Sequence, residues 1–158
     1  MTDEKKLEGL GGWLILVGLG IIASPIKISA QIYPVYSKLF AGGSWAALTT
    51  PGTEAYHPLW APILISEISI NVALALAWLF IAFLFLAKKR LFPKWYIGIF
   101  VFTLAFMLVD AVAIRAVLPN EEIFDPDTIK ELARTLVTML IWVPYMLMSK
   151  RVKATFVK

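Results

Sequence analysis

The sequence predicts an all-α integral membrane protein with four transmembrane helices, and three observations carry this prediction. Of its 158 residues, 59% are hydrophobic and 16% are charged, whereas a soluble domain has about 45–50% apolar and about 25% charged residues. The apolar residues gather in four runs, each about long enough to cross roughly 30 Å of hydrocarbon as a helix. The basic residues form short clusters beside these runs, which is the pattern that orients membrane proteins.

The first run covers residues 12–33 and is the least regular of the four. A helix that stopped at Pro25 would be only about 21 Å long, so we expect the helix to continue past a proline kink. A cleaved signal peptide is the alternative, because Lys5 and Lys6 precede an apolar stretch that ends in "ISAQ". Since Ile28 stands where a cleavage site needs a small residue, a retained span is favoured.

A long irregular segment, residues 34–61, precedes the second run. Glycine and proline punctuate it, so it is expected to lie outside the bilayer as a lid over the outer end of the helices. One short interfacial helix is possible within it, formed by four aromatic and apolar residues: Tyr36, Leu39, Phe40 and Trp45. His57 is the only histidine and is more typical of a surface residue than of a metal ligand.

The second run, residues 62–87, ends at three consecutive basic residues, and the third covers residues 95–118. The fourth run covers residues 129–148, and the stretch "FDPDTIKEL" marks its start. Asp127 is the predicted N-cap, with Lys130 and Glu131 in the first turn. Pro144 lies inside this run and predicts a kink near its end.

Charge asymmetry between the connections predicts the orientation. The connection "KKRLFPK" and the tail "SKRVKATFVK" are basic. In contrast, Lys38 is the only lysine or arginine in residues 34–61, and the last connection, "PNEEIFDPD", is acidic. Lys5 and Lys6 precede the first run. The positive-inside rule therefore places both termini in the cytoplasm. The net charge of +4 follows from these clusters, so no binding to nucleic acid is expected.

Polar residues inside the four runs fall into one layer of the outer leaflet. Counted along ideal helices from the cytoplasmic ends, Asp110 lies roughly 22 Å deep, and polar residues of the other runs lie roughly 21–30 Å deep. An unpaired charge at a helix centre costs about 2.5–3.5 kcal/mol, so these residues need partners. The predicted layer has the following members: Lys27, Glu67, Asn71, Asp110, Arg115, Glu131 and Arg134.

Two interpretations of this polar layer are open. Its three acids and three bases balance, which favours a set of clamps that hold the helices together. The alternative is a pocket, open to the outside, that binds an ion, a proton or a small polar molecule, because ionisable groups within a membrane are functional candidates. Asp110 and Arg115 are five residues apart and point about 140° away from each other on an ideal helix, so they are expected to serve different neighbours.

Motifs for catalysis or cofactor binding are not found in the sequence. There is no HExxH, no GxSxG and no carboxylate cluster with metal-ligand spacing. The absence of cysteine excludes disulfides and thiolate chemistry. Gly11, Gly12, Gly18 and Gly20 are expected to permit close helix packing rather than to bind a dinucleotide. The sequence therefore predicts a protein without enzymatic activity, cofactor or metal.

Several stretches resemble a bacterial family of small four-span inner-membrane proteins, known as domain of unknown function 2569. The stretches are "GLGGWLILVGLGIIASPI", "HPLWAPILISEI", "YIGIF", "LVDA" and "LIWVPYMLMSKRVKATFV". The resemblance implies the bacterial cytoplasmic membrane and a four-helix architecture, and it implies no activity or site residue. Physically, the closing stretch is a kinked helix end followed by a basic stop, so Lys150, Arg151 and Lys153 are candidates for contacts with anionic lipid headgroups.

A scaffold or accessory subunit is the favoured function, with membrane lipid and another membrane protein, or a second copy of the chain, as partners. A small transporter or channel component is the alternative, with an outward-facing pocket around Asp110, Arg134, Asn71 and Glu67. A lipid-modifying membrane enzyme is the third hypothesis, and the lack of a nucleophile–base or metal constellation argues against it.

Overall fold

The computed structural model describes residues 8–120 and 122–158, and these residues form helices and connections without a strand. Four of the described helices are long and apolar enough to cross a membrane: α2 (Trp13–Ala41), α4 (Trp60–Leu86), α5 (Phe92–Val117) and α6 (Pro126–Met148). Two short helices, α3 (Ser44–Thr49) and α7 (Lys150–Thr155), follow α2 and α6. The prediction of an all-α, four-span membrane protein is therefore confirmed.

Helix α2 is longer than the first run predicts. It contains both Pro25 and Pro34 and ends only at Ala41, so its 29 residues extend about 43 Å, well beyond roughly 30 Å of hydrocarbon. The proposed interfacial helix is consequently wrong in composition, because Tyr36, Leu39 and Phe40 belong to the last turns of α2. Only Trp45 lies in α3, which begins after Gly43 in a left-handed conformation (φ 73°) that glycine adopts without steric cost.

Helix α6 begins three residues earlier than its apolar run. The N-cap is Asp125, not Asp127 as predicted, because the Asp125 carboxylate accepts a 2.7 Å hydrogen bond from the Thr128 amide. Pro126 then occupies the first turn, where its missing N–H costs nothing. Hydrogen bonding from the Thr128 side chain, and then from the Thr128 amide, lowers the pKa of the Asp125 carboxyl below its ordinary value, since it favours the charged form.

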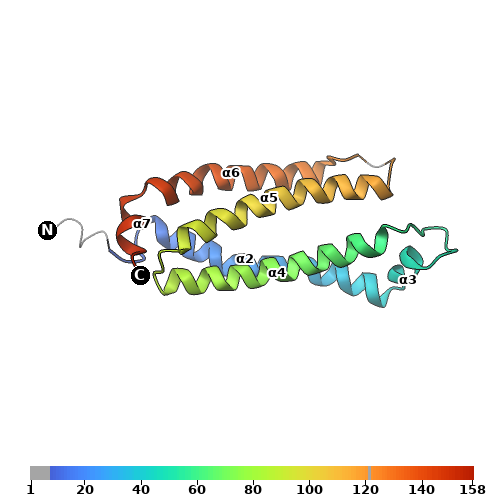
Figure 1. Cartoon of the computed structure of the whole chain (residues 1–158), viewed down its shortest axis with the longest axis horizontal. Coiled ribbons are helices and arrows are strands. Elements are labelled where there is room, and N and C mark those ends of the chain that lie inside the picture. Colours follow the sequence, from blue (N-terminus) through green and yellow to red (C-terminus); the bar gives the residue numbers. More distant parts are fainter. Residues whose placement is uncertain (1–7, 121) are drawn as a thin grey trace.

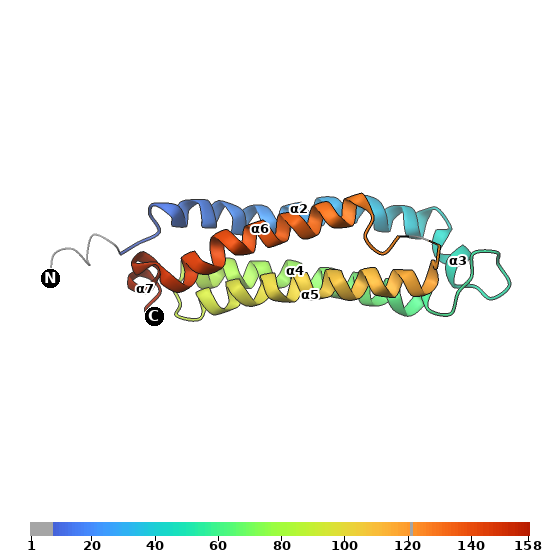
Figure 2. The same cartoon turned by 90° about the horizontal axis from the view of Figure 1, so that it is seen from above.

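The four long helices stand at the corners of a rectangle. Figure 1 shows α5 and α6 on one side of the bundle and α2 and α4 on the other, and in Figure 2 α2 and α6 lie together on the upper side. Going around the bundle, α2 packs on α4, α4 on α5 and α5 on α6, while the remaining side, between α6 and α2, is the most open among the described residues.

The apolar core occupies only the end of the bundle where α7 lies, called the α7 end below. Its fully buried side chains come from four helices: Leu14, Val17, Ile21, Ile81, Phe92 and Val152. Aromatic rings fill the space between them, with the Phe92 and Phe156 ring centroids 4.3 Å apart. A methyl group built on Gly18 would lie 3.0 Å from Phe85 Cε1, so the expectation that Gly18 permits close packing of α2 and α4 is confirmed. The same expectation is wrong for Gly20, where an added methyl group would meet no heavy atom of the described residues within 4 Å.

Helix α7 closes this end by folding back over it. The Gly9 amide donates to Thr155 Oγ1 at 3.1 Å, and the Thr155 hydroxyl donates to the Gly9 carbonyl at 3.2 Å. The Arg90 amide donates to the Lys158 carbonyl at 2.7 Å, which ties the C-terminus to the α4–α5 connection. Both ends of the described chain therefore lie at the α7 end. Lys5 and Lys6, used in the orientation prediction, lie outside the described residues.

The opposite end of the bundle, where α3 lies, is loosely packed. Among the described apolar residues there, only Leu39, Leu64 and Val117 are buried, and none of the three belongs to the core cluster. The space between the helices at this α3 end is lined by charged side chains such as Glu67 and Asp110 together with apolar ones such as Met107. The polar layer predicted from the sequence lies in this open half.

Candidate functional site

Six of the seven residues of the predicted polar layer line one of two cavities, and Asn71 is described separately below. The first group is a charged triad. Lys27 Nζ on α2 lies 3.9 Å from Glu131 Oε2 on α6, and Arg134 Nη1 lies 2.6 Å from Glu131 Oε1. One carboxylate thus serves two cations, and the triad of Lys27, Glu131 and Arg134 keeps a formal charge of +1. The Lys27 and Arg134 side chains are each 50% exposed, and that of Glu131 is 39% exposed.

The triad lies on the open side between α2 and α6, which we call the seam. Nearer the α7 end, Trp13 and Trp142 meet edge to face with ring centroids 6.3 Å apart. Between this contact and the triad is a cavity of about 230 Å³ that Ser24 and Thr138 help to line. Both hydroxyls donate to carbonyls of their own helices, at 2.7 and 2.8 Å, so the charged triad is the strongest polar feature of the seam.

A larger cavity of about 840 Å³ lies nearer the α3 end, among α2, α4, α5 and the start of α6. Arg115 is its one basic lining residue among those described. Six carboxylates line it as well: Glu67, Asp110, Glu122, Asp125, Asp127 and Glu131. The balance of acids and bases predicted for the layer as a whole is therefore not kept inside this acidic cavity, because Lys27 and Arg134 face the seam instead.

The two groups change the neighbours expected for Asp110. Asp110 lines the acidic cavity and Arg134 lines the seam, and no ion pair joins them in the described part of the chain. Asp110 and Arg115 were expected to serve different neighbours, but both line the acidic cavity. Glu131 lines both cavities and so forms part of the wall between them.

Asn71, the remaining member of the layer, has a partner that the sequence analysis missed. The Asn71 side-chain amide donates to the Tyr36 hydroxyl at 3.1 Å, which joins α4 to α2. Tyr36 was assigned to an interfacial helix, and its role became visible only because α2 continues past Pro34. The spacing of the two residues in the sequence, 35 positions, gives no local signal of this contact.

The three basic residues proposed to contact lipid headgroups have different surroundings. Lys150 and Lys153 are exposed on α7. Arg151 is partly buried, and its guanidinium lies against the backbone at the start of α2, where a methyl group built on Gly11 would be 3.1 Å from Arg151 Nη1. Arg151 therefore packs α7 against the chain's own N-terminal turn, while Lys150 and Lys153 face outward.

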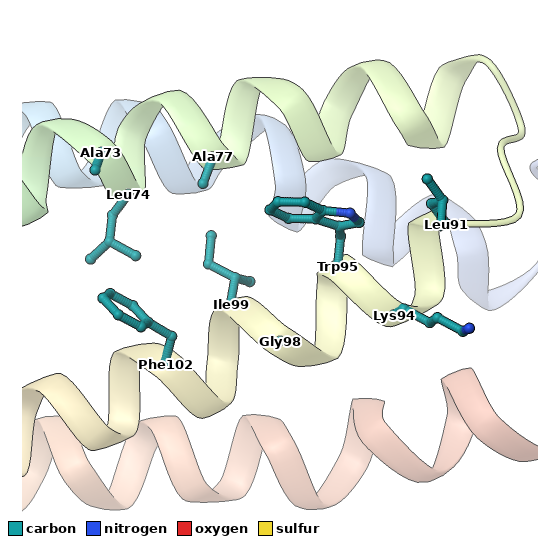
Figure 3. A pocket seen from close by; sticks show the side chains of 9 residues that line it. All are labelled: Ala73, Leu74, Ala77, Leu91, Lys94, Trp95, Gly98, Ile99 and Phe102. Atoms are coloured by element: carbon teal, nitrogen blue, oxygen red, sulfur yellow. The ribbon is translucent and has the colours of Figure 1, made fainter.

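An apolar groove lies on the side of the bundle opposite the seam, between α4 and α5. Its volume is about 480 Å³. Figure 3 shows Leu74 and Phe102 facing each other across it, while Lys94 lies near its other end and points away from these two residues. Lys94 is the single charged residue among those that line it. Nothing in the sequence pattern pointed to this groove, because its walls are ordinary apolar and small residues of two spans.

Metal binding has no structural support among the described residues, since no three histidine or carboxylate side chains in them are grouped so as to hold an ion. His57 Nδ1 instead accepts a 3.2 Å hydrogen bond from the Leu59 amide. The imidazole thus stabilises the turn that precedes α4.

Comparison with known proteins gives one positive result. No curated protein and no solved structure is significantly similar to the chain. The family described as "Protein of unknown function (DUF2569)" matches residues 7–157, so the match includes all four spans, α7 and the closing stretch that carried the resemblance. The chain is a multi-pass membrane protein and belongs to the DUF2569 family.

Proposed function

We propose that this protein is a non-enzymatic accessory or scaffold subunit of the bacterial cytoplasmic membrane, with both termini in the cytoplasm. Its seam binds a transmembrane helix of another membrane protein. The observation that carries the proposal is the half-exposed charged triad of Lys27, Glu131 and Arg134 on the open side of the bundle.

The depth of the triad supports a protein partner rather than contact with water. Lys27 lies about 21 Å along α2 from its first residue, and Arg134 lies about 21 Å from the last residue of α6. With those helix ends at one boundary of roughly 30 Å of hydrocarbon, both cations lie about 9 Å inside the other boundary. Half-exposed charges at that depth need a polar neighbour, and a partner helix against the open α2–α6 side would supply one.

The charge of the triad supports a carboxylate on the partner. A cation near the bilayer centre costs about 2.5–3.5 kcal/mol unless it is paired. Glu131 offsets one of the two cations, so one positive charge remains to be matched. A second copy docked symmetrically through the same seam would present the same surplus charge, which favours a different protein whose helix carries Asp or Glu at this depth.

The orientation is supported by the positions of the basic clusters. Lys88, Lys89 and Arg90 follow α4, and the exposed Lys150 and Lys153 lie on α7. Both clusters are at the end where the described chain begins and ends, and the acidic cavity is at the other end. Positive residues gather on the cytoplasmic side of membrane proteins, so the α7 end is the cytoplasmic end.

Photo-crosslinking in intact membranes tests whether the seam is covered. A photoreactive residue at Thr138, which lines the seam, should form an adduct with another protein, and one at Phe102 on the opposite side should not. The adduct should disappear in the double variant Lys27→Gln/Arg134→Gln and persist in Lys130→Gln, which removes an exposed cation from the start of α6. Adducts with lipid alone would refute the proposal, and adducts with a second copy would replace it by self-association.

A designed peptide tests the chemistry of the partner. We expect a poly-leucine transmembrane peptide with one Asp at matching depth to associate with the protein in liposomes, measured by energy transfer. Polar contacts in membranes average about 0.6 and reach about 1.7 kcal/mol, so the double variant should bind about threefold to twentyfold more weakly. A peptide with Ser in place of Asp is the control. Equal binding of both peptides would contradict a carboxylate partner.

The acidic cavity favours a second candidate function, a transport or channel component that binds a cationic solute. Its six carboxylates against one arginine would attract an organic cation at the outer end of the bundle. Spermidine should then raise the thermal unfolding temperature of the wild type but not of Asp110→Asn, with Glu54→Gln in the outer connection as the control. A similar rise in Asp110→Asn would assign the effect to general screening.

A further inference from the structure

We infer that the groove between α4 and α5 is a binding site for one anionic phospholipid of the cytoplasmic leaflet, with an acyl chain in the groove and the phosphate at Lys94. The site lies on the side of the bundle opposite the seam, so the inference does not depend on the protein partner proposed above.

The shape of the groove suits an acyl chain. Ala73 and Ala77 lie one turn apart on α4, and Gly98 faces the groove from α5, so three small residues leave the space that larger side chains would fill. A methyl group built on Gly98 would meet no heavy atom within 4 Å. The space beside Gly98 is therefore open.

One wall of the groove is held in place by aromatic contacts. The Trp95 ring packs edge-on against Phe80 of α4, with ring centroids 5.1 Å apart and planes 78° apart. Trp95 lies close to the start of α5, where tryptophan is favoured at the membrane–water interface. A wall fixed in this way lowers the ordering cost of binding a flexible chain.

The length of the groove matches one leaflet. Its lining extends along α5 from Leu91 to Phe102, which is about 16 Å of helix. This is about half of the roughly 30 Å thickness of the hydrocarbon. Since the groove begins at the α4–α5 connection, the leaflet is the one at the α7 end.

Charge at the mouth of the groove selects the headgroup. Lys94 is exposed at the start of α5, at the end of the groove nearest the connection that contains Lys88, Lys89 and Arg90. Within the described residues, no carboxylate lies within ion-pair distance of Lys94. An ammonium group beside an apolar groove at the level of the headgroups complements a lipid phosphate, and the neighbouring cations favour a headgroup with net negative charge.

Native mass spectrometry of the detergent-purified chain tests the site, with dioleoyl phosphatidylglycerol and dioleoyl phosphatidylcholine as probes. The first phosphatidylglycerol should bind more tightly than the first phosphatidylcholine. Lys94→Gln should weaken phosphatidylglycerol binding about fivefold, the effect of one basic residue at a lipid surface. It should weaken phosphatidylcholine binding less, because the choline ammonium of that lipid already offsets the charge of its phosphate. Lys150→Gln, which removes an exposed cation from the same end, should have a smaller effect.

A variant that fills the groove distinguishes lipid binding at this site from general electrostatic attraction between the protein and anionic lipid. Gly98→Leu should abolish the tight first binding of both lipids, whereas Gly20→Leu, also in open space on α2, should bind like the wild type. Helicity and unfolding of Gly98→Leu are measured in parallel, and Lys94→Gln carries the test alone if that variant does not fold. Unchanged binding in Gly98→Leu, or equal losses in Lys94→Gln and Lys150→Gln, would overturn the inference.

Discussion

The charged triad predicts which pairs of residues in the polar layer are energetically coupled. We expect Glu131→Gln to lower the free energy of unfolding by about 1–2 kcal/mol, because polar contacts in membranes are worth about 0.6 and at most about 1.7 kcal/mol each. The variant is nearly isosteric, so the loss comes from the two cations that remain without their shared carboxylate. The half-exposed side chains keep the estimate below the sum of two strong pairs.

The two ion-pair distances predict which coupling free energy is larger. Arg134 Nη1 lies 2.6 Å from Glu131 Oε1, whereas Lys27 Nζ lies 3.9 Å from Glu131 Oε2, at the limit of an ion pair. In double-mutant cycles the coupling of Glu131 with Arg134 should therefore approach the upper value, and that with Lys27 should lie near about 0.6 kcal/mol. Asp110 and Arg134 line different cavities and should couple by less than about 0.3 kcal/mol.

Equilibrium unfolding by dodecyl sulfate in mixed micelles, followed by tryptophan fluorescence, measures these energies. The cycles use the single variants Lys27→Gln, Asp110→Asn, Glu131→Gln and Arg134→Gln. The double variants combine Glu131 with Arg134, Glu131 with Lys27, and Asp110 with Arg134. A coupling of about 1 kcal/mol or more between Asp110 and Arg134, together with none between Glu131 and Arg134, would refute the division of the layer into two groups.

Three further predictions concern packing, helix capping and topology. Gly18→Ala should destabilise the protein by about 1–3 kcal/mol in the same assay, because the added methyl group meets the Phe85 ring. Gly20 lies in open space, so Gly20→Ala should be neutral or should stabilise the protein by up to about 1 kcal/mol. Hydrogen bonding from the Thr128 side chain and amide lowers the Asp125 pKa, so it stabilises the folded state above the unfolded-state pKa of about 3.9. This contribution is lost as the pH falls through the lower folded-state pKa. The wild type should therefore lose stability in that pH range by more than Asp125→Asn does. A reporter enzyme fused after Lys158 should be active only in the cytoplasm, and periplasmic activity would refute the orientation.

Much of the fold could be predicted because span length and apolar composition are local properties. The sequence correctly indicated four spans, the continuation past Pro25 and the role of Gly18. The extension of α2 to Ala41 was missed, because Pro34 was interpreted as the start of the outer segment. Proline removes one hydrogen bond and disfavours a helix, but the following turns of α2 keep packing on α4, and this outweighs the local preference.

For the candidate site, the sequence predicted only how deep each polar side chain lies in the membrane. Counting residues along a helix gives the distance of a side chain from the membrane boundary, so Lys27, Asp110, Glu131 and Arg134 were predicted to share one layer. It does not give the direction in which the side chain points relative to the other helices. That direction decides that Lys27 of α2 reaches Glu131 of α6 and that Asp110 faces a different cavity. The contact between Glu131 and Arg134 joins residues three positions apart on α6, so it follows from their spacing in the sequence.

The amino-acid sequence alone determined that this chain crosses a membrane four times and that ionisable residues lie within the spans, because both follow from composition and the rise of a helix. The tertiary structure alone decided that the core is confined to the α7 end and that the α2–α6 side stays open. It also decided that one groove ends at Lys94. The physical reason is that hydropathy measures only transfer into an apolar medium, and lipid and protein interior are equally apolar. Which helix faces meet therefore depends on the fit of side chains such as Gly18 and Phe85.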